Sequence, residues 1–473
     1  MKNFLLLALA LISTTLLAQK TKQDVFKSID SKGDQYTNVA HQIWEFAEVG
    51  YQEVKSSELL QETLTKAGFK MEKGVVGIPT AFVASYGSGK PVIAILAEFD
   101  ALPGVSQDAA PEVKPVPGRT AGHACGHHLF GTASAAAAIA VKDWMIFNKR
   151  SGTIRVYGTP AEEGGSGKVY MVRDGLFNDV DVVLHWHPDE KNGASPDQSL
   201  ANKSGKFRFH GIASHAAGSP DRGRSALDGV EAMDNMVNMM REHVPSDTRI
   251  HYVITRGGEA PNVVPAFAEV YYYVRHPEKE QVISIWDRVV KAAEGAALGT
   301  ETKVDFEITG GVYNLLANKT LAAAMDNNLR LVGGYTLDEK EKEFAQKIQK
   351  TFTDPPKLES TNMIEEFNED GNMMGSTDVG DVSWVVPTTG LSIATWVPGT
   401  SAHSWQAVAA GGMSIGNKGM MVAAKTIAGT AIDLFEQPAL VQEAWKEFNE
   451  TRPKDFKYEA LVGNRKPALD YRK

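Results

Sequence analysis

Residues 122–147 have the sequence GHACGHHLFGTASAAAAIAVKDWMIF, a cluster of histidine and cysteine followed by an alanine-rich run. Small side chains lie on every side of this run, which predicts a buried helix packed closely against a β-sheet. Cys125 and His127 precede it, two positions apart with a glycine between them. Thiolate and imidazole both bind zinc and similar metals, and glycine permits the bend that aims both at one ion. We expect a metal site where this helix begins.

Four other segments each begin as a short apolar strand and end in residues that can bind metal or transfer protons. They are PVIAILAEFDALPG (91–104), TIRVYGTPAEEGGSGK (153–168), DVVLHWHP (181–188) and LSIATWVPGTSAHSW (391–405). An open α/β sheet covered by helices on both faces places its ligands just past the carboxyl ends of its strands. The sequence therefore predicts an α/β fold in which these segments share one pocket.

Two adjacent acids, Glu162 and Glu163, follow the second of these strands. Adjacent residues leaving a strand point in different directions, so one carboxylate can bind the metal while the other faces the reacting water. Acidic pairs on exposed turns are common without any function. The neighbouring glycines, which stand in place of helix-forming residues, and the metal-binding cluster favour the functional interpretation here.

Three further histidines are candidate ligands. His185 and His187 alternate with Trp186 and would share one face of a strand that ran straight through them. Pro188 restricts His187 to an extended conformation and ends the element, so the residues alone leave open which of the two histidines reaches the pocket. His403 follows a Pro-Gly-Thr-Ser loop, and its functional interpretation depends on the other segments.

The composition is that of an ordinary globular protein, with 473 residues, 43% hydrophobic and 23% charged. This excludes collagen, coiled coil and wholesale disorder, and the length allows several domains. A formal net charge of −9 and the absence of a basic run argue against a nucleic-acid partner. The chain has one cysteine and therefore cannot form an internal disulfide.

Residues 1–18 have the pattern of a signal peptide, with a positive charge at Lys2 and an apolar stretch over residues 4–12. We therefore expect an exported protein, periplasmic or secreted. The alternative is an uncleaved N-terminal anchor. No later stretch approaches the roughly 18 uninterrupted apolar residues that a membrane span requires, so no membrane association is expected after signal removal.

The pattern of expected elements changes over residues 203–312. A strand, a helix, two strands, a helix and a final strand are expected in the order βαββαβ, the ferredoxin-like α+β arrangement. This region is predicted to be an inserted domain. It would divide the catalytic domain into a first part, residues 19–202, and a second part, residues 313–473.

The chain resembles the M20 metallopeptidase and amidohydrolase family, in its aminoacylase-like branch. The segments that carry the resemblance occur in order from residue 98 to residue 406: EFDALPG, GHACGHH, GTPAEEGG, LHWHP, GIASHAA with GRSALDG, GGEAPNVVP, GSTDVGDVSW and GTSAHSWQ. The resemblance implies a zinc-peptidase-like mixed sheet flanked by helices. It assigns the inserted domain to a lid over the site and to homodimer formation.

Carried over residue by residue, the resemblance implies Glu162 as the general base. It favours His187 over His185, because a histidine directly before the proline fits this branch best. Asp100 and Asp378 lie in motifs of the family and could orient a metal ligand through a hydrogen bond, and a plain structural role in a turn or loop is the alternative for both. The implied metal ligands are Cys125, His127, Glu163, His187 and His403. The residues implied to hold the substrate carboxylate or the developing oxyanion are His215, Asn262 and Arg275.

The function expected from the residues and the resemblance together is metal-assisted amide hydrolysis. One or two divalent ions, zinc or manganese, would activate a water molecule, and Glu162 would transfer its proton to the departing amine. The expected substrate is a small acylated amino acid or dipeptide such as p-aminobenzoyl-glutamate. The alternative is an exported metal-dependent binding protein with the same fold and no turnover. Glu162 argues against this alternative, because a carboxylate beside the ligand has no evident binding role.

Overall fold

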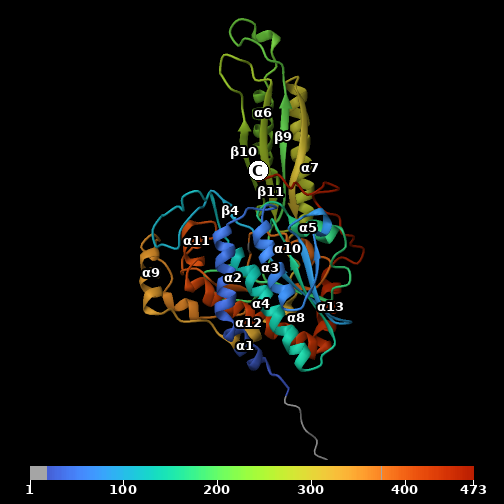
Figure 1. The fold of residues 1–473 in the computed structure, drawn as a ribbon. Helices are drawn as coiled ribbons and strands as arrows, with labels where there is room; N and C mark the ends of the chain where they lie inside the picture. Colours follow the sequence, from blue (N-terminus) through green and yellow to red (C-terminus); the bar gives the residue numbers. More distant parts are fainter. Residues whose placement is uncertain (1–18, 374, 473) are drawn as a thin grey trace, which may run out of the picture.

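The structure is a computed structural model that describes residues 19–373 and 375–472 (Figure 1). The predicted signal peptide, residues 1–18, lies outside the described residues. A broad body carries a narrower domain that projects from it, and the two have separate hydrophobic cores. The alanine-rich helix and the α/β sheet that the sequence predicts both belong to the body.

The body is built on a six-stranded mixed sheet in the order β1-β2-β6-β3-β7-β13. The four strands from β6 to β13 are parallel, whereas β1 and β2 pair antiparallel. All six residues of the central strand β3 are buried, as a strand covered on both faces requires. The strands are β1 (Lys70–Lys73), β2 (Phe82–Ser88), β3 (Val92–Ala97), β6 (Gly152–Gly158), β7 (Val182–Leu184) and β13 (Thr388–Thr389).

The predicted alanine-rich helix is α4 (His127–Phe147), and it packs directly on β3 and β6. Its small residues allow this approach, since a Cβ atom at Gly131 would lie 2.6 Å from the carbonyl oxygen of Glu98. Helix α12 (Ser414–Glu436) and helix α2 (Gly33–Phe46) cover its outer side. Within the described residues, α4 is also the helix whose length and composition would suit a membrane span, but 83% of that stretch is buried, as in a core helix.

The remaining elements of the body complete the layers around this sheet. Helices α3 and α8 contact the sheet, and α1 packs on α12. The helices are α1 (Lys22–Ser31), α3 (Val54–Lys66), α5 (Gly167–Arg173), α8 (Lys319–Val332), α9 (Glu339–Gln349), α10 (Val379–Ser383), α11 (Trp405–Gly411) and α13 (Pro438–Thr451). The short pieces are β4 (Leu102–Pro103), β5 (Ala121–Gly122), η1 (Val75–Gly77) and η4 (Leu358–Asn362).

Two of the predicted strands differ from expectation. Strand β7 ends at Leu184, so no straight strand carries His185 and His187 together; a new strand, β8 (His187–Asp189), begins at His187. The indole of Trp186 is buried between them and donates to the carbonyl of Phe130, which turns the chain. The segment near residue 391 forms β14 (Ser392–Ala394), which pairs with β8 in a separate two-stranded sheet and does not join the main one.

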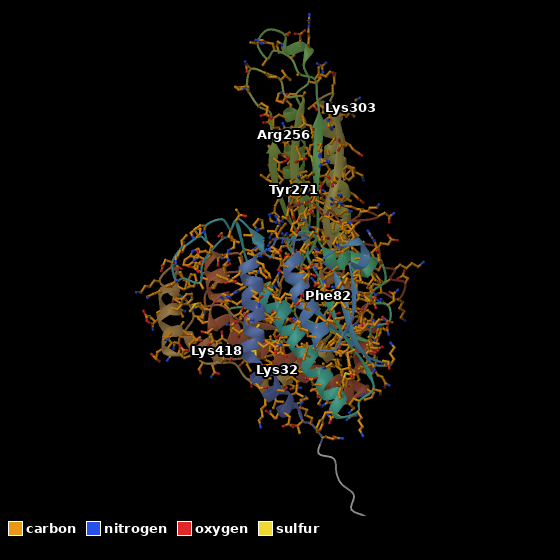
Figure 2. The ribbon with its side chains drawn as sticks, viewed as in Figure 1. Lys32, Phe82, Arg256, Tyr271, Lys303 and Lys418 are labelled. Atoms are coloured by element: carbon orange, nitrogen blue, oxygen red, sulfur yellow. The ribbon has the colours of Figure 1, made fainter. Side chains whose placement is uncertain are left out.

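The projecting domain has the predicted βαββαβ order and a four-stranded antiparallel sheet, β10-β11-β9-β12. Figure 2 shows Arg256 and Lys303 higher on this domain than Tyr271, which lies toward the body. Lys303 pairs with His210, so the far end of β9 lies at that upper level. The elements are β9 (Ala201–His210), η2 (Pro220–Arg222), α6 (Ala226–Met240), η3 (Arg241–His243), β10 (Arg249–Arg256), β11 (Phe267–His276), α7 (Lys279–Gly299) and β12 (Lys303–Val312).

Candidate metal centre

Cys125, His127 and His187 form a first group of potential ligands, and their donor atoms lie within 4.8 Å of one another. Cys125 Sγ is 3.4 Å from His187 Nε2. His127 is the first residue of α4, and Gly126 before it has a positive φ of 75°. A Cβ atom at Gly126 would lie 2.6 Å from the Pro188 ring, so glycine here both makes the turn and lets β8 approach.

A second group shares the same cysteine and adds Glu163 and His403, again with donor atoms within 4.8 Å. His403 Nε2 lies 3.2 Å from Glu163 Oε1. The loop that carries His403 is fixed by a hydrogen bond from its backbone N–H to the carbonyl of Ala124, at 2.9 Å. Because Cys125 belongs to both groups, the two groups are adjacent and can hold two neighbouring cations.

A third group joins His127 to Glu162 and to Glu98, a residue that the sequence reasoning did not single out. Glu98 is buried at the end of β3, and its Oε2 lies 3.1 Å from His127 Nε2. The signal was available, because Glu98 lies in the segment 91–104, two positions before Asp100. The prediction from this motif, however, named only Asp100.

A second observation, apart from the types of residue present, indicates that these groups suit a divalent cation. Three buried atoms, Glu98 Oε2, His127 Nε2 and Glu163 Oε1, have no hydrogen-bond partner among the described residues. Each nevertheless lies close to another atom of the cluster that could ligate a metal. Buried polar atoms are almost always satisfied, so unsatisfied buried atoms that converge on one place fit a bound cation.

Asp100 contacts one residue from each of the first two groups of potential ligands. Its Oδ1 lies 2.9 Å from His127 Nδ1, and its Oδ2 accepts the backbone N–H of Glu163 at 3.0 Å. Burial opposes ionisation of Asp100, but the charge and hydrogen bond of His127 hold its pKa below the usual value. This contact directs the Nε2 atom of His127 toward the cluster, as a carboxylate behind a ligating histidine does.

Glu162 lies in a different electrostatic setting from its neighbour Glu163. Burial, followed by the negative charges of Glu98 and Glu163, raises the pKa of Glu162 well above that of an ordinary glutamate. Burial also opposes ionisation of Glu163, but the neighbouring imidazole of His403, 3.2 Å away, holds the pKa of Glu163 below its usual value. Two adjacent carboxylates with opposite shifts are suited to two roles, proton transfer and ligation.

Lys168 is a second buried residue that the sequence reasoning missed. Its side chain is fully buried, and its Nζ lies 2.7 Å from both Glu98 Oε1 and Asp378 Oδ1. Asp378, predicted as a support, thus acts through Lys168 rather than by touching a ligand. Nothing in the segment GGSGK indicates that its lysine is buried, because lysine at such a position is normally solvated.

A cavity of about 650 Å³ opens beside these groups, within the size range of small-molecule sites. His185 lines it but belongs to none of the three ligand groups, and its ring packs against Gly390. The predicted site residues that line the cavity are Cys125, Glu162, Glu163, His187, Arg275, Asp378 and His403.

His215 and Asn262, predicted to hold the substrate, do not line this cavity. They lie in paired loops at the far end of the projecting domain, where His215 forms a bridge with Val263. Asn202, near the start of β9, does line the cavity. The remaining length of β9 places the His215 loop about 25 Å away, at roughly 3.3 Å per residue.

Comparison with known proteins identifies the family of the chain. A family model, "Peptidase family M20/M25/M40", matches residues 94–406. The chain is 44% identical to one of the p-aminobenzoyl-glutamate hydrolase subunits of Escherichia coli over 457 residues, which cover 90% of this chain and 95% of that protein. It is 30% identical to the Xaa-Arg dipeptidase of Mus musculus, over 90% of this chain and 92% of that one.

Two solved structures share the fold at low sequence identity. An aminobenzoyl-glutamate utilization protein from Klebsiella pneumoniae superposes with a TM-score of 0.59 at 16% identity, covering 86% of this chain and 98% of that one. A dinuclear metal-binding peptidase of the M20 family from Bacillus subtilis gives 0.58 at 16% identity, covering 86% and 99%. Together with the family match, these likenesses confirm the predicted fold class and family: the chain belongs to peptidase family M20/M25/M40 and is a metal-dependent hydrolase of that family.

Proposed function

We propose that this hydrolase cleaves the amide bond of a small acylated amino acid or dipeptide, of the kind represented by p-aminobenzoyl-glutamate. The observation that carries the proposal is the convergence of five potential ligands and Glu162 beside one cavity of about 650 Å³, which Glu162 and four of the five ligands line. The names of the E. coli and mouse relatives, an acyl-glutamate hydrolase and a dipeptidase, support the same substrate class.

Cys125, His127 and His187 would hold one divalent cation, and Glu163 and His403 would hold a second with Cys125 shared between them. Thiolate, imidazole and carboxylate together suit zinc, and manganese is the alternative. A cation bound there would polarise the scissile carbonyl and lower the pKa of a water molecule toward neutrality. The dinuclear site of the B. subtilis peptidase supports two ions rather than one.

The proton transfers belong to Glu162. Its carboxylate oxygen lies within 4.8 Å of ligating atoms of Glu98 and His127, close enough to take a proton from a water molecule held there and to return it to the departing amine nitrogen. Asp100 keeps His127 Nδ1 occupied, so that Nε2 remains directed at the cluster. Arg275 lines the cavity from β11 and would bind the free carboxylate of the substrate.

We also propose that the chain acts as a homodimer through the projecting domain. Strand β10 lies at the edge of its sheet and exposes Val253 and Ile254, and an exposed apolar edge is a site for pairing. His215 and Asn262 lie too far from the cavity of their own chain to act there. In a dimer they would reach the cavity of the partner subunit. Their position therefore supports the proposed dimer.

Export to the periplasm or medium is proposed on the pattern of residues 1–18 alone. Expression of the full chain in a bacterial host, followed by fractionation and N-terminal sequencing, tests it. A mature chain that begins near residue 19 in the periplasmic fraction is expected. An intact Met1 in the cytoplasmic fraction would contradict the proposal.

The test of the activity is a substrate panel with protein loaded with zinc or manganese. Dipeptides, N-acetyl and N-benzoyl amino acids and p-aminobenzoyl-glutamate are compared by release of the free amine. Glu162→Gln is expected to lower kcat at least 100-fold, because a general base contributes about that much or more, while substrate binding persists. A Glu162→Gln variant as active as the parent would end the assignment of this base. Binding without turnover by the parent on every substrate would favour the binding-protein alternative.

A further inference from the structure

The C-terminal segment after α13 returns to the metal centre. Figure 1 shows this red segment at the junction of the body and the projecting domain. Arg465 donates to the carbonyl of Ile308 and pairs with Glu307 at 2.7 Å, which ties the segment to β12. Farther on, the carbonyl of Leu469 accepts from the side chain of Gln52 at 2.7 Å. The segment is therefore anchored to both parts of the molecule before it reaches the cavity.

The last two described residues contact the turn that carries the paired glutamates. Tyr471 Oη and Arg472 Nη2 both donate to the backbone carbonyl of Glu163, at 3.2 and 2.7 Å. The guanidinium of Arg472 also lies over the ring of Tyr471, 4.9 Å from its centroid. These contacts fix the head group at the wall of the cavity, which it lines.

Arg472 has donors left over. Its Nε is buried and has no hydrogen-bond partner among the described residues. The same is true of Arg275 Nε on the projecting domain, whose Nη1 makes only a long 3.4 Å contact with Ser376. A guanidinium carries five N–H donors and binds a carboxylate through two of them. Both head groups therefore keep donors that a substrate oxygen can satisfy.

The charges around the cavity restrict where an anion can bind. Among its described lining residues, Arg275 and Arg472 are the permanently charged cations. Six carboxylates line the same cavity: Glu98, Glu162, Glu163, Asp189, Glu190 and Asp378. Lys168 already offsets the charges of Glu98 and Asp378. Arg275 and Arg472 are therefore the lining groups best suited to hold the carboxylates of an anionic substrate.

We propose that Arg472 is a specificity-determining residue that binds a second carboxylate of the substrate, so that the enzyme selects acylated dicarboxylic amino acids. The inference rests on the proposed function, in which Arg275 binds the first carboxylate. The name of the E. coli relative is consistent with it, because glutamate has two carboxylates.

The test compares p-aminobenzoyl-glutamate with p-aminobenzoyl-glutamine, which have nearly the same shape and differ by one negative charge. The parent is expected to prefer the glutamate compound at least tenfold in kcat/KM, because a charge-assisted hydrogen bond is worth about that factor or more. Arg472→Gln is expected to bring the ratio close to one, and Arg472→Lys to retain part of it. Lys466→Gln, an exposed charge change on the same segment, is expected to leave the ratio unchanged.

The ratio separates recognition from support of the turn. If Arg472 only holds the Glu163 carbonyl, Arg472→Gln lowers kcat for both compounds equally and leaves the ratio unchanged, which would overturn the inference. A parent that hydrolyses both compounds without preference would overturn it as well.

The binding of the two compounds to metal-loaded Glu162→Gln protein, by calorimetry, gives a readout that needs no turnover. A preference there that Arg472→Gln removes supports the inference even if the parent hydrolyses neither compound, in which case the proposed function alone fails. Equal affinity for the two compounds, or a preference that survives Arg472→Gln, would overturn the inference.

Discussion

At the scale of single residues, the metal centre is supported by a buried ion network. Lys168 neutralises Glu98 and Asp378, which lie on two different segments, and no part of the lysine side chain is exposed. Burial disfavours a charged lysine, but the charges of Asp378, Glu98 and Glu162 more than offset this and raise the pKa of Lys168. The network therefore keeps a permanent positive charge behind the ligands.

Replacement of Lys168 tests the weight of this network. Lys168→Met has nearly the same length but leaves two buried carboxylates without their cation, a change that costs about 3 to 5 kcal/mol of unfolding free energy. Urea denaturation of the parent and variant, both metal-free, measures the difference. The control is Lys191→Met at an exposed ion pair, which is expected to change stability by less than about 1 kcal/mol. A Lys168→Met loss as small as that of the control would show that the network adds little stability.

At the scale of the elements, α4 determines where the ligands lie. The helix begins at His127 and is held close to β3 through Gly131. Alanine normally favours a helix over glycine by about 1 kcal/mol. At Gly131 the added Cβ would lie 2.6 Å from the Glu98 carbonyl oxygen and 2.9 Å from Leu60 Cδ1, so the helix would have to move away from the strand.

Gly131→Ala is therefore expected to lower the unfolding free energy by about 1 to 3 kcal/mol, despite its better helix propensity. The matched control is Gly295→Ala in α7, where the nearest atom to the new Cβ is Met236 Sδ at 3.8 Å. That variant is expected to be neutral or stabilising by up to about 1 kcal/mol. Thermal unfolding of both proteins measures the pair. A stabilising Gly131→Ala would mean that α4 can move without cost.

The elements also show what the sequence could predict. Strands β3 and β6 and helix α4 were predictable because an apolar run or an alanine-rich run carries its own burial signal. The pairing of β14 with β8 was not, because it depends on the chain turning at Trp186, and no local pattern encodes that contact. Segments that end in His, Glu or Cys could be assigned to one pocket, because each lies just past a predicted strand or at the start of a predicted helix.

Some parts of the site had no sequence signal. Lys168 and Arg472 have charged side chains that resemble solvated surface residues, and their partners lie far away along the chain. The residues alone left open the choice between His185 and His187, the family resemblance favoured His187, and the structure places His187 beside Cys125. Their roles as ligand or lining residue remain predictions for metal-binding experiments.

At the scale of the whole molecule, two parts with separate hydrophobic cores both contribute residues to the wall of the cavity. The core of the projecting domain surrounds Tyr272, whose hydroxyl donates to the buried carboxylate of Asp234. Burial raises the pKa of Asp234 from 3.8 to about 6, although the Tyr272 hydrogen bond opposes the rise. This group therefore makes the stability of the domain depend on pH.

The sign of this dependence follows from proton binding. Between about pH 4 and pH 6 the folded state holds a proton on Asp234 that the unfolded chain has lost, so the unfolding free energy falls as pH rises. Asp234→Asn keeps an oxygen to accept from Tyr272 and cannot ionise. Relative to pH 4, the variant is expected to be more stable than the parent at pH 7 by about 1 to 3 kcal/mol. Urea titrations at both pH values that show no such gain would contradict the assigned pKa.

The measurement that tests the metal centre most directly is X-ray absorption at the zinc edge of the zinc-loaded protein. The convergence of Cys125 with the imidazoles predicts one sulfur ligand at about 2.3 Å and nitrogen or oxygen ligands at about 2.0 Å. Because the chain has a single cysteine, Cys125→Ala must remove the sulfur signal entirely. A zinc ion surrounded by oxygen and nitrogen alone in the parent protein would contradict the account.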